Sequence, residues 1–279
     1  MSIWFQNKYS PDTFLKIKIK KTLCKQQSDF QKIEIIDTHE FGRMLVLDGI
    51  VNVTEKDEFI YHEMMVHVPV FTHPNPKDVL VIGGGDGGVV REILKHSQVK
   101  RIDLVEIDPL VVDISKKYLP GVSAGLREPR LNIFFDDGTN FLKNKKNLYD
   151  LIIIDSPDPV GAGKKLFHEI FYSKCFNALK KDGLLTAHSE TPEFKKELRI
   201  MKSMYKKFKR IFPVVRTFTA CVPSYTICIW SFAFCSKKYD PIDDFQLSRY
   251  RKQKIITYYY NADIHRSCFA LPNYLKGAL

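Results

Sequence analysis

The stretch Asp78-Val-Leu-Val-Ile-Gly-Gly-Gly-Asp-Gly-Gly-Val-Val-Arg-Glu-Ile-Leu94 decides the fold of this 279-residue chain. Its apolar beginning predicts a buried parallel strand, its glycines a tight turn, and its end, from Val89, a helix. A second apolar run at 101–107 contains Glu106, 20 positions after Asp86. This pattern is typical of a nucleotide-binding βαβ unit, in which an acidic residue at the end of the second strand binds the ribose hydroxyls of an adenosine.

Asp86 is the unusual residue of this turn. A loop that binds a pyrophosphate does not normally carry a carboxylate among its glycines, because two negative charges would face each other without water between them. We therefore expect the part of the ligand that lies next to Asp86 to be cationic.

Composition excludes several classes of protein. The formal net charge of +11, from 43 Lys+Arg against 32 Asp+Glu, raises the question of a nucleic-acid partner. The lysines are scattered over turns and helix faces without interleaved aromatic residues, so we expect no nucleic-acid partner. The six cysteines form no close pair, which argues against a zinc site or a disulfide framework. Since no run approaches ~18 apolar residues and no signal peptide is recognisable, we expect a cytoplasmic protein with no membrane partner.

The pattern of apolar residues divides the chain into two domains. Residues 1–70 are predicted to form a small N-terminal domain of antiparallel β-strands, with a hairpin at Asp48-Gly49 and a helix at 58–68. The strands of this domain are predicted at 14–20, 30–36, 43–47 and 51–54.

Residues 71–279 are predicted to form a larger α/β domain, because strands and helices alternate from Asp78 onward. Two strands without an intervening helix, 214–220 and 227–235, complete a seven-stranded sheet. Such a terminal antiparallel pair indicates a Rossmann-like sheet of the methyltransferase type rather than that of a dehydrogenase. The other strands are predicted at 78–82, 101–107, 131–135, 149–155 and 183–188, and the helices near 87–95, 109–118, 139–143, 167–180 and 193–210.

Acidic residues follow four successive strands of this sheet, at the edge where a ligand would bind. They are Asp86, Glu106, Asp136-Asp137 and Asp155-Ser-Pro-Asp158. An aspartate after a strand is often only a helix N-cap, and this alternative stays open for each residue taken singly. Taken together, so many carboxylates repel one another unless the natural ligands are cations. A ligand made of adenosine, a sulfonium and a free amine fits, with Asp137 accepting a hydrogen bond from the adenine amine.

Long segments of the chain resemble the spermidine synthases, a family of polyamine aminopropyltransferases. The glycine-rich stretch 82–90 carries the resemblance, which extends from about Phe30 to Leu279. The further segments are Phe41-Gly-Arg-Met-Leu-Val-Leu-Asp-Gly49, Glu55-Lys-Asp-Glu-Phe-Ile-Tyr-His-Glu-Met64, Asp155-Ser-Pro-Asp-Pro-Val-Gly161, Val222-Pro-Ser-Tyr225 and Tyr259-Tyr-Asn-Ala-Asp-Ile-His-Arg-Ser-Cys-Phe-Ala-Leu-Pro272.

The resemblance implies transfer of the aminopropyl group of decarboxylated S-adenosylmethionine to putrescine, giving spermidine and 5′-methylthioadenosine. The donor is a co-substrate, so no cofactor and no metal are expected, and the family implies a homodimer or homotetramer. The resemblance also implies the site residues: Gln31 and Asp86 for the aminopropyl donor, Glu106 for the ribose, Asp137 and Gly138 for the adenine, Tyr61, His62, Asp158 and Tyr225 for the acceptor amine, and Asp155 as the base.

Three departures from the family pattern leave the acceptor open among putrescine, cadaverine, agmatine and longer amines. They are Ala162, the segment 226–228 and His188, and the nearby Glu190 is a possible partner for the far ammonium of a diamine. Two alternatives to this enzyme remain: an S-adenosylmethionine-dependent methyltransferase of the same fold, and a non-catalytic protein that binds polyamines or nucleic acid.

Overall fold

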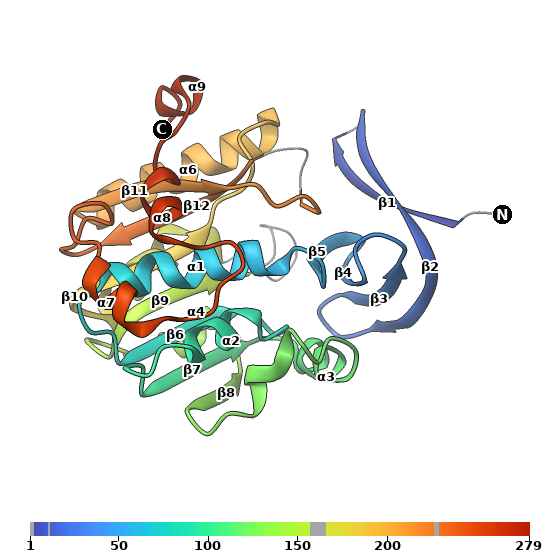
Figure 1. The fold of residues 1–279 in the computed structure, drawn as a ribbon, viewed down its shortest axis with the longest axis horizontal. Coiled ribbons are helices and arrows are strands. Elements are labelled where there is room, and N and C mark those ends of the chain that lie inside the picture. Colours follow the sequence, from blue (N-terminus) through green and yellow to red (C-terminus); the bar gives the residue numbers. More distant parts are fainter. Residues whose placement is uncertain (1–2, 11, 157–165, 226–228) are drawn as a thin grey trace.

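The computed structural model describes residues 3–10, 12–156, 166–225 and 229–279. These residues form two sheets, a five-stranded antiparallel sheet and a seven-stranded sheet that carries helices on both faces. The small sheet stands beside the larger α/β body, and helix α1 (Glu58–Thr72) runs from it across that body (Figure 1). The α/β class, the seven-stranded sheet and the N-terminal β unit predicted from the sequence are confirmed.

The small sheet contains one strand that the sequence did not reveal. Its hairpin at Asp48-Gly49 is as predicted, and both residues have the positive φ that such a turn requires. The first strand was missed because it lies at the edge of the sheet, where Ile3 and Trp4 are both exposed and apolar alternation is lost. The second strand is longer than predicted. The strands are β1 (Ile3–Ser10), β2 (Thr13–Gln27), β3 (Lys32–Thr38), β4 (Arg43–Leu47) and β5 (Ile50–Thr54).

The large sheet has the order β11-β12-β10-β9-β6-β7-β8. Strands β6 to β10 are parallel, whereas β12 pairs antiparallel with β10, and β11 with β12. The carboxyl ends of the parallel strands therefore meet at one edge. The strands are β6 (Asp78–Gly83), β7 (Arg101–Glu106), β8 (Leu131–Phe135), β9 (Tyr149–Asp155), β10 (Leu179–His188), β11 (Val214–Ala220) and β12 (Trp230–Ser236).

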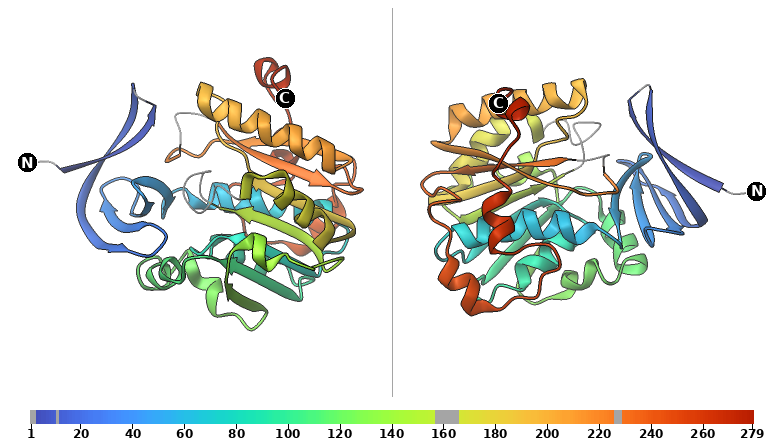
Figure 2. Two further views of the ribbon diagram at one scale, coloured as in Figure 1. Left: turned by 180° about the vertical axis from the view of Figure 1, so that it is seen from behind. Right: turned by 45° about the horizontal axis from the view of Figure 1, so that its top comes forward.

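Successive side chains of a strand point to opposite faces, and this alternation builds two cores on the large sheet. Val79 and Val81 of β6 pack with α1 and α2, whereas Leu80 and Ile82 pack with α5 and α6. Figure 2 shows these helices on the two sides of the sheet. No helix in the described part of the chain is both long and apolar enough to cross a membrane. The remaining helices are α2 (Gly88–Leu94), α3 (Pro109–Tyr118), α4 (Gly138–Phe141), α5 (Glu169–Ala178), α6 (Lys195–Ile211), α7 (Leu247–Gln253), α8 (Ala262–Ser267) and α9 (Asn273–Lys276), with a 3₁₀ turn at Ser123–Arg127.

Helix α1 is buried on almost every side, and this explains one wrong prediction. The helix was expected to end at Val68, before Pro69, but it continues to Thr72, and the amide of His73 donates to the Pro69 carbonyl. A proline inside a helix removes one backbone hydrogen bond. Here the burial of nearly the whole helix in the core of the large sheet offsets that loss.

Asp57 ties the small sheet to the large one just before α1. Its Oδ1 accepts hydrogen bonds from Thr54 Oγ1 at 2.5 Å and from Ser224 Oγ at 2.9 Å, and its Oδ2 accepts one from the Ser224 amide at 2.7 Å. The carboxylate is buried and lies next in space to the segment that carries Tyr225.

We predict that Asp57→Asn lowers the free energy of unfolding by about 2 kcal/mol, because an amide has one acceptor oxygen for three donors. Urea unfolding measures this loss. The exposed Asp243→Asn is the control and should stay within about 0.5 kcal/mol of wild type. Equal stability of the two variants would show that Asp57 does not hold the sheets together.

Candidate active site

A cavity of about 380 Å³ lies between the small sheet and the carboxyl ends of the strands of the large sheet. Of the site residues predicted from the sequence, all but one lie in its wall. Asp158 lies outside the described residues, as do Ala162 and the segment 226–228. The predicted residues in the wall are Gln31, Tyr61, His62, Asp86, Glu106, Asp137, Gly138, Asp155 and Tyr225.

Glu106 lies at the end of β7 and is held by backbone amides. Its Oε2 accepts from the Gly85 amide at 3.1 Å and its Oε1 from the Asp108 amide at 2.9 Å. Burial raises the pKa of Glu106 to about 7, although these hydrogen bonds oppose the shift. A Cβ at Gly85 would lie 2.9 Å from Oε2, so glycine is what lets the turn approach this carboxylate.

Asp108 is a residue that the sequence analysis missed, and it joins the two sheets. It caps α3 by accepting from the Leu110 amide, and its other oxygen accepts from Gln31 Nε2 at 3.0 Å and Ser28 Oγ at 2.7 Å. The Asp-Pro pair at the start of α3 signals an N-cap, but nothing in the sequence shows that Gln31 meets it.

Asp137 also serves as an N-cap, as its alternative interpretation held. Its Oδ1 accepts from the amides of Thr139 and Asn140, which begin α4. The same residue lines the cavity, so the cap fixes its position there. A Cβ at position 138 would lie 2.7 Å from Ile82. Because Gly138 has no side chain, α4 can lie close to the end of β6.

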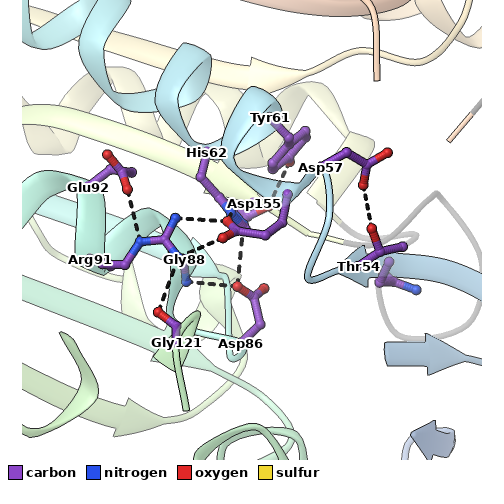
Figure 3. Close-up of polar contacts among 12 residues, drawn as sticks. Thr54, Asp57, Tyr61, His62, Asp86, Gly88, Arg91, Glu92, Gly121 and Asp155 are labelled. Carbon is purple, nitrogen blue, oxygen red and sulfur yellow. Dashed lines mark hydrogen bonds and ion pairs between the residues drawn. The ribbon is translucent and has the colours of Figure 1, made fainter. Parts of the chain in front are cut away.

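Asp86, Asp155 and His62 gather in one corner of the cavity (Figure 3). One carboxylate oxygen of each aspartate and one ring nitrogen of His62 all lie within 4.8 Å of one another. Tyr61 donates its hydroxyl proton to Asp155 Oδ1 at 2.6 Å. Among the described residues, the buried Oδ2 of Asp155 has no hydrogen-bond donor. Burial, and then the charge of Asp86, raise the pKa of Asp155 to about 6.

The pKa of Asp86 shifts in the opposite direction, because the side chain of His62 lies next to it. Burial disfavours its charged form, but the His62 imidazolium at 3.3 Å and the Gly88 amide at 2.8 Å lower its pKa. His62 itself is fully enclosed, and burial alone would lower its pKa. The carboxylates of Asp86 and Glu58 outweigh burial and raise that pKa to about 10. The two aspartates therefore differ: Asp86 stays ionised, and Asp155 is the one that can take up a proton near neutral pH.

One end of the cavity is aromatic. Tyr225 donates its hydroxyl to the carbonyl of Asn52 in the small sheet, and its ring lies 5.5 Å from Tyr61 and 5.0 Å from Trp230, centroid to centroid. The ring of His188 stacks on Trp230 with an interplanar angle of 6°. Glu190 also lies in the wall, so a carboxylate stands beside this apolar surface. Apolar walls with carboxylates at separated points suit an aliphatic diamine.

Comparison with known proteins agrees with this geometry. Residues 58–246 match the family described as the spermine/spermidine synthase domain, and residues 3–55 match the spermidine synthase tetramerisation domain. The chain belongs to the spermidine synthase family. It is 46% identical over 279 residues to the polyamine aminopropyltransferase of Alkaliphilus oremlandii and 47% identical to that of Clostridium perfringens, covering 100% of this chain and 98% of each relative.

Two solved spermidine synthases have the same fold. One was determined in complex with the transition-state analogue AdoDATO, with a TM-score of 0.96 and 42% identity, and the other is that of Thermotoga maritima, with a TM-score of 0.95. Each match covers 99% of this chain and 94% of the solved one. The protein is thus a polyamine aminopropyltransferase, as the resemblance implied, and the methyltransferase alternative is not favoured.

The raised pKa of Asp155 has a measurable effect on the stability of this aminopropyltransferase. Because the folded protein binds the Asp155 proton more tightly than the unfolded chain does, the contribution of Asp155 to stability falls as the pH rises from about 4 through 6. Ionised Asp155 then costs on the order of 3 kcal/mol.

We predict that Asp155→Asn raises the melting temperature at pH 8 by several degrees. The gain should shrink as the pH is lowered towards 4, where wild-type Asp155 is protonated and the substitution changes no charge. Calorimetry over this pH range measures the difference. A gain that does not depend on pH would contradict this account.

Proposed function

We propose that this enzyme transfers the aminopropyl group of decarboxylated S-adenosylmethionine to putrescine, giving spermidine and 5′-methylthioadenosine, with Asp155 as the base. The observation that carries the proposal is the unequal pair in one cavity: an ionised Asp86 and, beside it, an Asp155 with a pKa of about 6. One is suited to binding a cation and the other to accepting a proton.

The chemistry requires position and proton removal. The amine nitrogen attacks the carbon next to the sulfonium, the C–N bond forms, and the C–S bond breaks with its electron pair left on sulfur. A sulfonium is already a good leaving group, so in-line positioning is the main requirement. A primary ammonium with a pKa near ~10 must first lose a proton. Two cations in one cavity lower that pKa, which favours transfer of the proton to Asp155.

The proposed binding roles follow the places of the residues in the wall. Glu106 receives the ribose, Asp137 and Gly138 the adenine, and Gln31 and Asp86 the aminopropyl chain. Tyr61, His62 and Tyr225 surround the acceptor amine, together with Asp158, whose role rests on its sequence motif. The aromatic end beside Glu190 supports a diamine as the acceptor, and putrescine is the proposed one.

We further propose that the chain needs no cofactor, because the sulfonium supplies its own leaving group. A homotetramer or homodimer is proposed, since residues 3–55 match a tetramerisation domain and β1 exposes apolar side chains. The five cysteines in the described part of the chain are free thiols, which supports a reducing cytoplasmic setting.

The test is an assay with decarboxylated S-adenosylmethionine and a panel of amines, in which methylthioadenosine is measured. Putrescine should give the highest kcat/KM. A higher kcat/KM with cadaverine or agmatine would show that this amine, and not putrescine, is the acceptor. The absence of product with any amine would refute the proposal.

Asp86 should also decide which donor is accepted. The carboxylate of intact S-adenosylmethionine would approach Asp86, and at ~4 Å with an effective dielectric constant of ~20 the repulsion is roughly 4 kcal/mol. We predict that Asp86→Asn narrows the discrimination between decarboxylated and intact donor by up to about three powers of ten. Binding titrations of both donors measure it, and unchanged selectivity would count against this role.

Tyr61 should set the pH at which Asp155 works. Its hydrogen bond favours the ionised Asp155, so Tyr61→Phe raises the pKa of that carboxyl group. We predict that the acid limb of kcat/KM for putrescine, near pH 6 in wild type, moves up by about 0.5 to 1 in the variant. Tyr149→Phe is the matched control. The Tyr149 hydroxyl donates to the buried Asp103 at 2.7 Å, and neither residue lines the cavity. An equal shift in both variants would exclude a specific effect of Tyr61.

A further inference from the structure

We propose that Glu58 and Arg91 are positioning residues of the donor site: with His62 they form a buried chain of ion pairs that fixes the Asp86 carboxylate towards the aminopropyl amine. Neither Glu58 nor Arg91 lines the cavity, so both act through other side chains. The inference rests on the proposed function, because it assigns the donor amine to Asp86.

The chain of contacts alternates in charge from one group to the next. Figure 3 shows Asp86, His62, Arg91 and Glu92 of this chain. Asp86 Oδ1 lies 3.3 Å from His62 Nε2, and His62 Nδ1 lies 2.5 Å from Glu58 Oε2. Glu58 holds Arg91 by two parallel hydrogen bonds of 2.7 and 2.8 Å. Arg91 Nε then donates to Glu92 at 2.9 Å. Carboxylate and cation thus alternate over five side chains.

Burial makes each of these charges depend on the next. His62 and Glu92 are almost fully buried and Glu58 is 8% exposed, so an unpaired charge at any of them would be costly. Burial alone would neutralise Glu58, but His62 and Arg91 hold its pKa below its usual value. Without Glu58, His62 would have a single carboxylate partner at hydrogen-bonding distance, and Asp86 would face Asp155 with a weaker counter-charge.

The backbone fixes the imidazole in place as well. A Cβ at Gly88 would lie 2.2 Å from His62 Cε1, so the start of α2 lies directly against the ring. Gly88 also donates its amide to Asp86 Oδ1, the same oxygen that faces His62. In the described part of the chain these contacts leave the other oxygen of Asp86 for a ligand.

The ionisable groups that face His62 come from four elements. Glu58 and Tyr61 lie on α1, Asp86 in the turn after β6, and Asp155 at the end of β9, while Arg91 on α2 acts through Glu58. Removing Glu58 removes one of the two carboxylates that raise the pKa of His62 to about 10. The imidazolium should then lose its proton at a lower pH, and donor binding should weaken from that pH upward.

The experiment uses Glu58→Gln in the full-length enzyme, with the Km of each substrate, kcat and the titration of His62 by histidine-labelled NMR as readouts. We expect the donor KM to rise about tenfold or more, the putrescine KM to stay within about twofold, and the His62 pKa to fall by more than about 1. Arg91→Lys keeps the charge but loses the paired hydrogen bonds. It should raise the donor KM and lower the His62 pKa, each by less than Glu58→Gln does.

Glu63→Gln is the matched control on the same helix. Glu63 is fully buried, and its carboxylate accepts from the amides of Tyr258, Tyr259 and Tyr260 without touching His62. It should lose stability and keep the wild-type donor KM. If Glu58→Gln and Glu63→Gln lose similar stability and neither changes the donor KM or the His62 titration, the inference is overturned.

Two further outcomes separate this inference from the proposed function. A wild-type enzyme that forms no methylthioadenosine refutes the proposed function, and the assignment of the donor amine to Asp86 fails with it. Product formation with an unchanged His62 titration in Glu58→Gln and Arg91→Lys refutes the positioning chain alone. If Glu58→Gln does not fold, the donor KM and the His62 titration of Arg91→Lys test the inference.

Discussion

The candidate active site depends on the repulsion between two carboxylates. Asp86 lies in the turn after β6, and Asp155 lies at the end of the neighbouring strand β9. Gly83, at the end of β6, pairs in register with Asp155 of β9, so the turn after β6 brings Asp86 beside Asp155. Water would normally screen such a pair, but here both side chains are only partly exposed. The protein resolves the conflict unequally: a buried imidazolium supports Asp86, and Asp155 keeps a high proton affinity. One repulsive contact thereby gives the two carboxylates different proton affinities, as the proposed roles of Asp86 as a cation site and Asp155 as a base require.

The small sheet completes this arrangement. Gln31 reaches Asp108 at the start of α3, Asn52 receives the hydroxyl of Tyr225, and Asp57 binds the backbone before Tyr225. Each contact joins residues far apart in sequence, and the apolar faces of β3 and β4 pack on α3 at the same junction. The cavity is closed by a unit that would be too small to be stable alone, and that is stabilised by packing on the larger body.

The sequence predicted what strand order and residue chemistry determine locally. The βα rhythm placed acidic residues at the strand ends, and parallel pairing brought Asp86, Glu106 and Asp155 to one edge. It could not predict Glu58 or Arg91, because a charged residue near the end of a helix is usually solvated and nothing local shows that it is buried. Strand β1 was missed since Ile3 and Trp4, which are successive residues on opposite faces, are both exposed, so that the strand lacks apolar alternation. The end of α1 was misplaced because tertiary packing overrode the local effect of proline.

The overall charge of the chain is opposite to that of its cavity. A net charge of +11 repels cationic substrates at long range, yet the charged residues in the wall of the cavity are mainly acidic. At physiological ionic strength surface charges are screened beyond roughly 8 Å, so scattered lysines weaken the approach of a polyamine only slightly. Buried carboxylates are screened much less. Recognition of the amine therefore depends on a few enclosed charges whose positions are fixed by Glu58, His62 and the glycines of the turn, and not on the field of the whole protein.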